Sequence, residues 1–315
     1  MSGVTITAGV SFSGAFTFTE APTPENTAAW FGGGGATVST VDRITFATDT
    51  ATASVRGPLS SVRQGLAAAS NLTDGWFGGG LNPAFSPSTL SRVDRITYAT
   101  DTATASVRGP LSSARRYLAA AGNTTDGWFG GGFTGSPVST VDRITYATDT
   151  ATASERGPLS VGKYLVAAAG NTTDGWFVGG FPGGSLVARI TYATDTATAS
   201  VRGPLSAGRY RLAAAGNETD GWFGGGNNAG AHSSVQRITY ATDTATASVR
   251  GPLSSGRYSF AAAGNETNGW FGGGIEPWTV STVDRITYAT DTATASVRGP
   301  LSSARGYLAA AGGIQ

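Results

Sequence analysis

The 315-residue sequence contains no cysteine and only one histidine and one methionine. The lack of cysteine excludes disulfides, zinc–thiolate sites and thiol nucleophiles, and it leaves the redox compartment open. Charged residues make up 13% of the chain and the net charge is +1, whereas an average soluble domain has roughly 25% charged residues. Because so weak a charge provides no basic surface for a phosphate backbone, we expect no nucleic-acid partner.

Long apolar runs are also missing. No stretch approaches the roughly 18 apolar residues of a membrane-spanning helix, so we expect no membrane span. The first ten residues, MSGVTITAGV, lack the basic start and the continuous apolar segment of a signal peptide. The sequence therefore encodes no Sec signal that we recognise.

Residues for catalysis and metal binding are scarce. With one histidine and no cysteine, an enzyme would need a pair of carboxylates with divided acid and base roles. Glu155 and Glu276 are the acids found at variable places in the sequence. Each repeated Thr-Asp-Thr segment carries one carboxylate, which is too few for the six to eight oxygen ligands of calcium. We predict no enzyme activity, no metal and no cofactor, with a loop-based glycosidase as the less favoured reading.

What the chain does have is repetition. The segment DTATASVRGPLS occurs at residues 101–112 and again, unchanged, at residues 291–302. Its first residue recurs at intervals of 46 to 52 residues, at Asp49, Asp101, Asp149, Asp195, Asp243 and Asp291. Periods in this range are typical of solenoids, propellers and arrays, in which each repeat buries its surface against its neighbours.

Each repeat predicts four short strands. In the second repeat, DGWFGGG predicts a turn at Asp74-Gly75 and a strand that ends in glycines. Residues 95–109 predict a hairpin with its turn at Thr100-Asp101, which Pro110 ends. The following LAAAG segment could be read as helix, because alanine favours helices. It is too short, and Pro-Leu-Ser and Gly-Asn flank it, so we predict a strand whose small side chains converge on an axis.

These observations predict an all-β, six-bladed β-propeller of four-stranded blades. The first repeat begins at Trp30 without a preceding LAAAG segment, and the last repeat ends with LAAAGGIQ without a following WFGGG. The N- and C-terminal strands therefore complete one blade and close the ring. We assign residues 1–20 to an N-terminal β arm, 21–29 to a proline-containing linker and 30–315 to the propeller.

The repeat resembles kelch repeats, over residues 30 to 313. A Gly-Gly strand end at Gly79-Gly80, Tyr98 followed by Thr102, and Arg115 before Leu118 are similar to the kelch pattern. Kelch repeats have a tryptophan where this chain has Ala105, and the tryptophan here precedes the glycines instead. The resemblance implies kelch-like blades of four strands.

The N-terminal arm alternates apolar and polar residues over positions 4–19, VTITAGVSFSGAFTFT. One face of the extended segment carries the apolar side chains Val4, Ile6, Val10, Phe12, Phe16 and Phe18. Such a strand is expected to pair with a sheet edge of its own or of another subunit. The arm and the repeats are similar to segments of bacteriophage virion proteins, notably those of cyanophages, and this resemblance implies a virion structural protein.

The repeats differ mainly in the loops between the glycines and the Arg-Ile-Thr strand. Strand alternation places these loops on the same face as the Arg-Gly-Pro-Leu-Ser crossings, and loops on one face of a rigid scaffold commonly form binding sites. Their bulky members, which we predict as ligand-binding residues, are Phe85, Phe133, Phe181, His232 and Trp278. The alternative is that these side chains cover blade edges.

Three repeated residue types have both a structural and a functional interpretation. The tryptophans that precede the glycines either pack between blades or form sugar-stacking platforms. Their regular placement predicts packing between blades. The arginines of the Arg-Ile-Thr strands pair with an Asp or a carbonyl of the next blade, or bind anions. The Asn-x-Thr segments are formally glycosylation sequons, and without a signal peptide we interpret them as turns whose asparagines cap the backbone.

The predicted function is a non-enzymatic structural or adhesive subunit of a phage virion or an extracellular appendage. The arm would assemble it with copies of itself or with another virion or appendage protein. The variable loops would bind a surface glycan or receptor, and its location would be virion or extracellular. The alternative is a multivalent carbohydrate-binding, lectin-like propeller, whose repeated sites would gain avidity from repetition.

Overall fold

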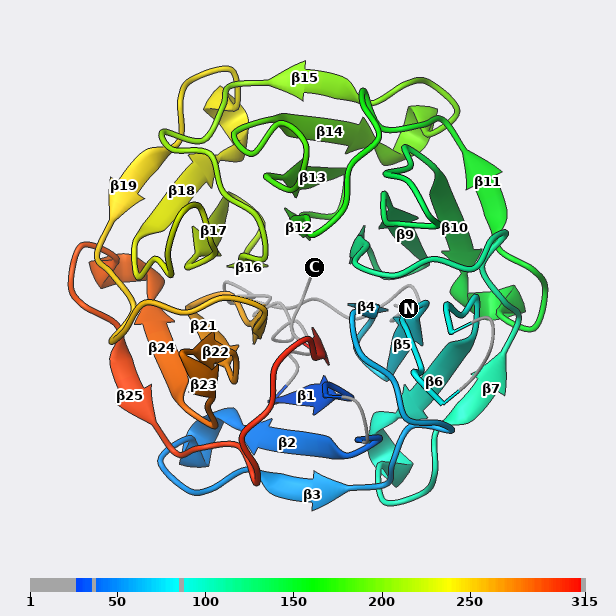
Figure 1. The fold of residues 1–315 in the computed structure, drawn as a ribbon, viewed down its shortest axis with the longest axis horizontal. Helices are drawn as coiled ribbons and strands as arrows, with labels where there is room; N and C mark the ends of the chain where they lie inside the picture. Colours follow the sequence, from blue (N-terminus) through cyan, green and yellow to red (C-terminus); the bar gives the residue numbers. More distant parts are fainter. Residues whose placement is uncertain (1–26, 36–37, 85–87, 313–315) are drawn as a thin grey trace, which may run out of the picture.

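The computed structural model describes residues 27–35, 38–84 and 88–312, and it confirms the all-β, six-bladed propeller. Six antiparallel four-stranded sheets surround a central axis, with the alanine-rich strands innermost and the Ser-Val-Arg strands, Ser-Glu-Arg in blade 3, at the rim (Figure 1). The arm residues Val4, Ile6, Val10, Phe12, Phe16 and Phe18, and Phe85 of the second repeat, lie outside the described residues.

The blades are numbered along the chain, and each is given from its inner to its outer strand. Blade 1 contains β26 (Ala309–Ala311), β1 (Ala28–Gly32), β2 (Val41–Thr45) and β3 (Ser54–Arg56). Blade 2 contains β4 (Ala67–Ser70), β5 (Asp74–Gly78), β6 (Val93–Thr97) and β7 (Ser106–Arg108). Blade 3 contains β8 (Ala119–Gly122), β9 (Asp126–Gly130), β10 (Val141–Thr145) and β11 (Ser154–Arg156).

The second half of the chain repeats this arrangement. Blade 4 contains β12 (Ala167–Gly170), β13 (Asp174–Val178), β14 (Val187–Thr191) and β15 (Ser200–Arg202). Blade 5 contains β16 (Ala213–Gly216), β17 (Asp220–Gly224), β18 (Val235–Thr239) and β19 (Ser248–Arg250). Blade 6 contains β20 (Ala261–Gly264), β21 (Asn268–Gly272), β24 (Val283–Thr287) and β25 (Ser296–Arg298), and its loop adds a small hairpin of β22 (Ile275–Glu276) and β23 (Trp278–Thr279).

Two predicted turns differ in detail. Asp74 and Gly75 belong to β5, because the turn lies at residues 71–73. There the side-chain oxygen of Asn71 accepts hydrogen bonds from the backbone N–H groups of Thr73 and Asp74. This confirms the capping role predicted for the Asn-x-Thr segments. The third strand of each blade is followed by a 3₁₀ turn, as at Tyr98–Thr100 in blade 2, so the returning strand β7 is only three residues long.

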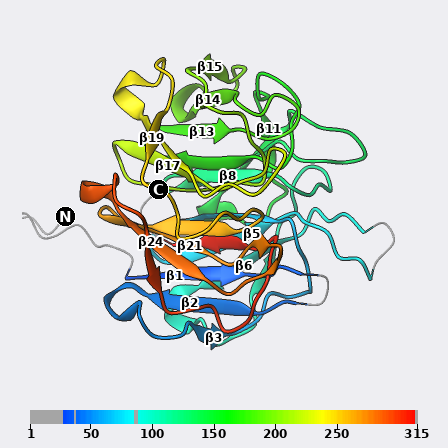
Figure 2. The ribbon, with the colours of Figure 1, turned by 60° about the vertical axis from the view of Figure 1, so that its left-hand side comes forward.

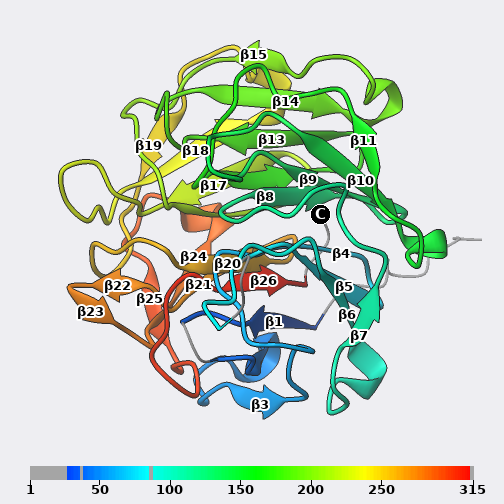
Figure 3. The ribbon, with the colours of Figure 1, turned by 45° about the vertical axis from the view of Figure 1, so that its right-hand side comes forward.

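Antiparallel order gives the propeller two different faces. The loop face carries the variable loops and the crossings between blades, and the turn face carries the Asn-x-Thr turns and the 3₁₀ turns. In Figure 2 the loop after β9 extends to the right and the 3₁₀ turns of blades 5 and 6 lie to the left. Figure 3 shows the β22–β23 hairpin projecting from the body of the propeller. The predicted placement of the variable loops is therefore confirmed.

Adjacent blades are joined by the same contacts all round the ring. The Trp76 ring of blade 2 stacks on Tyr146 of blade 3 with the ring centroids 3.7 Å apart, and its Nε1–H donates to Asp149 at 2.8 Å. Arg95 and Arg108 of blade 2 form ion pairs with the same carboxylate at 3.1 and 3.5 Å. Asp149 and its equivalents, predicted only as turn residues, are thus the centres of the blade interfaces.

Ring closure uses the same chemistry. The strand β26 pairs with β1, with Trp30 opposite Ala311, as the complementary chain ends predict. Across the neighbouring interface, Trp270 of blade 6 stacks on Phe46 of blade 1 and donates to Asp49 at 2.8 Å. Arg305 at the end of the chain forms an ion pair with Asp42 at 2.9 Å.

Each Arg-Gly-Pro-Leu-Ser crossing requires glycine for a steric reason. A Cβ atom on Gly57 would overlap the carbonyl group of Ala103 in the next blade, and the Gly57 N–H donates to the carbonyl of Asp101 at 2.8 Å. The equivalent Gly299 meets Ala51 in the same way across the ring closure. Only glycine lets the two backbones approach this closely.

Candidate functional site at the centre of the loop face

Six equivalent residues, one from each blade, meet around the axis on the loop face. We call them the axial ring, and they are Gly65, Tyr117, Leu165, Arg211, Ser259 and Tyr307. Each stands at the end of a crossing, two residues before an inner strand. The N–H of each donates to the carbonyl oxygen of its counterpart in the preceding blade, at 2.6 to 2.9 Å, and the bond from Gly65 to Tyr307 closes the circle.

The axial ring has an unfavourable backbone conformation. All six residues have φ between 57° and 65°, the left-handed region in which glycine is the natural residue. Five of the six are not glycine, and each of these adds a cost of about 1 kcal/mol or more. Gly65 is the exception because a Cβ there would lie 2.7 Å from the ring of Tyr117. The chain therefore places tyrosine, arginine, leucine and serine side chains at the axis despite a backbone that favours glycine.

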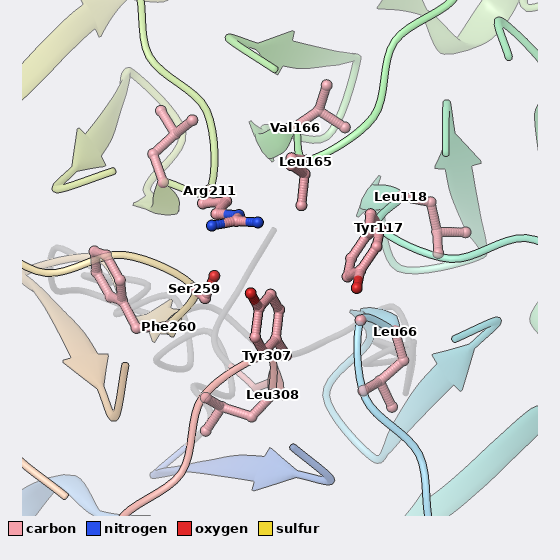
Figure 4. A pocket seen from close by; sticks show the side chains of 12 residues that line it. Leu66, Tyr117, Leu118, Leu165, Val166, Arg211, Ser259, Phe260, Tyr307 and Leu308 are labelled. Atoms are coloured by element: carbon pink, nitrogen blue, oxygen red, sulfur yellow. The ribbon is translucent and has the colours of Figure 1, made fainter. Parts of the chain in front are cut away.

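These side chains surround a small cavity at the mouth of the central channel. In Figure 4 the side chains of Tyr117, Arg211 and Tyr307 reach toward the axis from three different blades. The cavity has a volume of about 60 Å³. The next residue of each blade is apolar and also lines the cavity; these residues are Leu66, Leu118, Val166, Leu212, Phe260 and Leu308.

Arg211 is the cation at this mouth. Its guanidinium carbon lies 5.7 Å from the ring centroid of Tyr210, 5.5 Å from that of Tyr258 and 5.7 Å from that of Tyr307. Among the residues that the structure describes, Arg211 makes no ion pair, and its buried Nε has no hydrogen-bond acceptor. The arginines of the Arg-Ile-Thr strands, such as Arg95, are instead paired with aspartates of the next blade.

Aromatic rings continue outward from Tyr117 over blades 3 and 4. The Tyr117 ring lies 5.8 Å from Tyr307 and 6.4 Å from Tyr164. Tyr164 in turn contacts Phe133 at 5.0 Å and Phe181 at 5.9 Å. Burial raises the pKa of the Tyr117 hydroxyl, while the positive charges of Arg116 and Arg211 act in the opposite direction. The loop face thus combines a half-buried arginine with a continuous group of aromatic side chains.

The structure places the predicted loop residues in different surroundings. Phe133 and Phe181 join this aromatic group through Tyr164, and Phe181 is 53% exposed. His232 lies in the loop of blade 5, where its Nε2 is 3.3 Å from the carbonyl oxygen of Asn228. Trp278 stands on the β22–β23 hairpin with 81% of its surface exposed and has no ring contact among the described residues. The binding role predicted for these residues stays a prediction.

The interpretation of the repeated tryptophans as packing residues is confirmed. Trp76 and Trp176 are each 1% exposed, and both stack on a tyrosine of the next blade. Clefts of about 380 and 490 Å³ do lie between blades on the turn face, beside Trp30 and Trp176 respectively. Their tryptophan rings have no free face, so stacking of a sugar would need another side chain.

Sequence reasoning passed over the axial ring, although a signal was present. The two residues before each inner-strand Leu-Ala-Ala-Ala segment or its variant are Gln-Gly, Arg-Tyr, Tyr-Leu, Tyr-Arg, Tyr-Ser and Gly-Tyr along the chain. This pair differs in every repeat, while the residues on both sides are nearly constant. Variation at a position where the scaffold is constant indicates a site that the scaffold itself does not determine.

The described part of the chain contains no group of three or more His, Asp and Glu side chains placed to hold a metal ion. Within the same residues no helix is long and apolar enough to cross a membrane.

Comparisons with known proteins give information on the fold and none on the site. No protein-family model matches the sequence, and a search of curated proteins finds no match. Among solved structures the chain is similar to YjhT, with a TM-score of 0.63, 11% sequence identity, and coverage of 79% of this chain and 87% of that one. At this identity the likeness shows the propeller fold alone.

Proposed function

We propose that this protein is a non-enzymatic binding subunit that holds its ligand at the axial ring of the loop face. The observation that carries the proposal is the left-handed backbone of the ring, at which five residues with side chains stand where glycine would cost least. Costly local conformations that persist in an otherwise regular scaffold commonly mark functional sites. At the axial ring the blades present glycine, tyrosine, leucine, arginine and serine at one equivalent position of the scaffold.

The side chains of the ring favour binding over catalysis. Its titratable members are one arginine and two tyrosines, Arg211, Tyr117 and Tyr307. Hydrolysis of a glycoside or an ester usually needs a paired acid and base, or a nucleophile with a base beside it. Tyrosine and arginine are instead the residues that most often dominate binding interfaces.

Replacing the ring side chains with glycine gives a direct test. In the triple variant Tyr117→Gly, Arg211→Gly and Tyr307→Gly, every substituted position keeps a φ that glycine adopts freely. The variant should fold as the parent does, because the hydrogen-bond circle uses only backbone atoms. We expect the parent to bind a set of immobilised glycans and bacterial cell surfaces, and the triple variant to lose that binding.

A matched control changes the opposite face. The double variant Thr172→Ala and Glu218→Ala removes a hydrogen-bonded pair on the turn face, and it should bind as the parent does. Equal binding by the parent and the triple glycine variant would place the ligand elsewhere and overturn the proposal.

The second candidate is the multivalent carbohydrate-binding propeller. The clefts between blades favour it, because the cleft beside Trp30 and the cleft beside Trp176 are formed by equivalent residues of different blades. In that case the glycine variant would bind as the parent does, and the turn-face variant would bind fewer ligands per chain. Binding would also saturate at several ligands per chain.

We further propose that the subunit belongs to a phage virion or an extracellular appendage and assembles through its N-terminal arm. The support is the one-sided apolar pattern of residues 4–18, which an isolated strand would expose to water. Light scattering and negative-stain images of the full chain and of a chain beginning at Ala21 test this. Oligomers formed only by the full chain would support assembly through the arm, and monomers of both would contradict it.

A further inference from the structure

We infer that the axial site binds the acidic terminus of a glycan, with Arg211 holding a carboxylate or sulfate group at the mouth of the channel. This inference rests on the proposed binding function and names the ligand class of the same site. Three features carry it: an arginine without a carboxylate partner, a cavity of limited size, and the aromatic surface beside it.

The positive charge of Arg211 favours an anionic ligand. Arg211 is surrounded by three tyrosine rings and has no ion pair among the described residues. Arg116 lies nearby, with its guanidinium carbon 5.5 Å from the ring centroid of Tyr117 and 5.3 Å from that of Phe133. An arginine fixed against aromatic rings keeps its planar N–H groups available for a carboxylate or sulfate. The acids Glu218 and Glu266 belong to the Asn-x-Thr turns of the opposite face.

The size of the cavity limits what enters it. A volume of about 60 Å³ compares with roughly 300–1,000 Å³ for a pocket that encloses a small molecule. It accommodates a few water molecules or one terminal acidic group. The rest of the ligand must therefore lie on the outer surface of the loop face.

The surface next to the cavity suits sugars. Tyr164, Phe181 and Tyr210 form a path of aromatic rings, with centroid distances of 5.9 and 6.4 Å between neighbours. Such rings offer flat apolar faces, and the tyrosines add hydroxyl groups for hydrogen bonds. The backbone N–H groups of the axial ring are already used in the closed circle, so an extended peptide would find no free backbone partner there. These features favour a glycan over a peptide.

The six blades contribute different side chains to one shared axis, so the site should bind one ligand per chain. A lectin with a site at each blade interface would instead bind up to six. Stoichiometry therefore separates the axial site from binding between blades.

Calorimetric titration of the full chain tests the inference with three oligosaccharides that differ only in the terminal residue. These end in glucuronate, in a sulfated glucose and in glucose. We expect one site per chain, and tighter binding of at least one acidic sugar than of the neutral one. Arg211→Gln, which keeps a polar side chain and removes the charge, should weaken that binding roughly 10- to 150-fold, the range for a hydrogen bond to a charged group. Arg211→Lys should restore part of the loss.

Arg92→Gln is the matched control, because it removes a positive charge elsewhere on the loop face, where Arg92 contacts Ser60. It should leave the affinity unchanged. Equal affinity for acidic and neutral sugars, unchanged binding by Arg211→Gln, or a stoichiometry near six would overturn the inference. A peptide with a free terminal carboxylate that binds more tightly than both acidic sugars would also overturn it.

The two proposals fail in different ways. If the triple glycine variant loses binding and Arg211→Gln does not, the axial site stands and the acidic ligand is wrong. If the triple glycine variant binds as the parent does, the axial site itself is wrong.

Discussion

Lys163 in blade 4 replaces a buried arginine that the other five blades contain. In blade 3 that arginine, Arg115, forms an ion pair with Asp142 at 2.9 Å. Blade 4 has Ala188 at the aspartate position, and among the described residues the Lys163 amine donates only to the carbonyl oxygens of Phe177 and Leu186, at 3.2 and 3.3 Å. Burial without a counter-charge lowers the pKa of Lys163 from 10.5 to about 7.

This residue predicts a pH-dependent stability. Between pH 7 and 10.5 the unfolded chain binds a proton at Lys163 that the folded chain does not, so stability should rise with pH across this window. At one pKa unit per about 1.4 kcal/mol, the full effect is roughly 5 kcal/mol. Burial raises the pKa of Tyr146 and Tyr192, which acts in the opposite direction above pH 10, so the measurement should end near pH 9.5.

Urea unfolding at several pH values between 7 and 9.5 checks this prediction. Lys163→Met should remove the rise in stability with pH, and Ala188→Asp should reduce it by supplying the missing carboxylate. That carboxylate would also accept a hydrogen bond from the buried Ser160 hydroxyl, which has no partner among the described residues. Parallel curves for the parent and Lys163→Met would contradict the assignment.

At the scale of the elements, the blades are joined by the aspartate that begins each repeated motif. Asp149 is a representative case: it accepts from Trp76 and pairs with Arg95 and Arg108, and its side chain is 6% exposed. Asp149→Ala should leave the Trp76 N–H buried without an acceptor and lower the free energy of unfolding by roughly 2–4 kcal/mol. Asp49→Ala should cost the same, since Asp49 meets Trp270, Arg285 and Arg298 in the same geometry.

Chemical denaturation of both variants measures this effect. Glu155→Ala, on the exposed outer strand β11, is the control and should change stability by less than about 0.5 kcal/mol. A loss below about 1 kcal/mol in both aspartate variants would show that these carboxylates contribute little to joining the blades.

At the scale of the whole molecule, stability depends on closing the ring. The strand β26 pairs with β1 through Trp30, Phe31 and Gly32, and its alanines pack in the cores on both sides of blade 1. A chain that ends at Tyr307 would keep the axial ring but leave the edge of β1 without a partner. Exposed strand edges pair with other chains, so we expect association and a lower melting temperature.

Light scattering and thermal melts compare this truncation with a chain that ends at Gly312, which keeps β26. The Gly312 chain should behave as the full chain does. Equal mass and equal melting temperature for both truncations would mean that the other five blades hold the ring without closure.

The sequence by itself determined the propeller. The period of the repeats, the four short strands in each and the complementary chain ends at Trp30 and Leu308 were sufficient to predict six blades and their closure. This was possible because strand and turn patterns are local and because six similar copies repeat the same evidence. The packing of the tryptophans and the capping by Asn71 followed from the same local reasoning.

Only the tertiary structure decided what lies at the axis and what joins the blades. Tyr117, Arg211 and Tyr307 are 94 and 96 residues apart, and only the closed ring brings them around one cavity. The variable residue pair before each inner strand marks these positions in the sequence, but the circle of hydrogen bonds and the left-handed backbone are seen only in the assembled ring. Likewise, the sequence identifies Asp149 only as a turn residue of its own blade. Its contacts with Trp76 and Arg95 exist only because blade 2 packs against it.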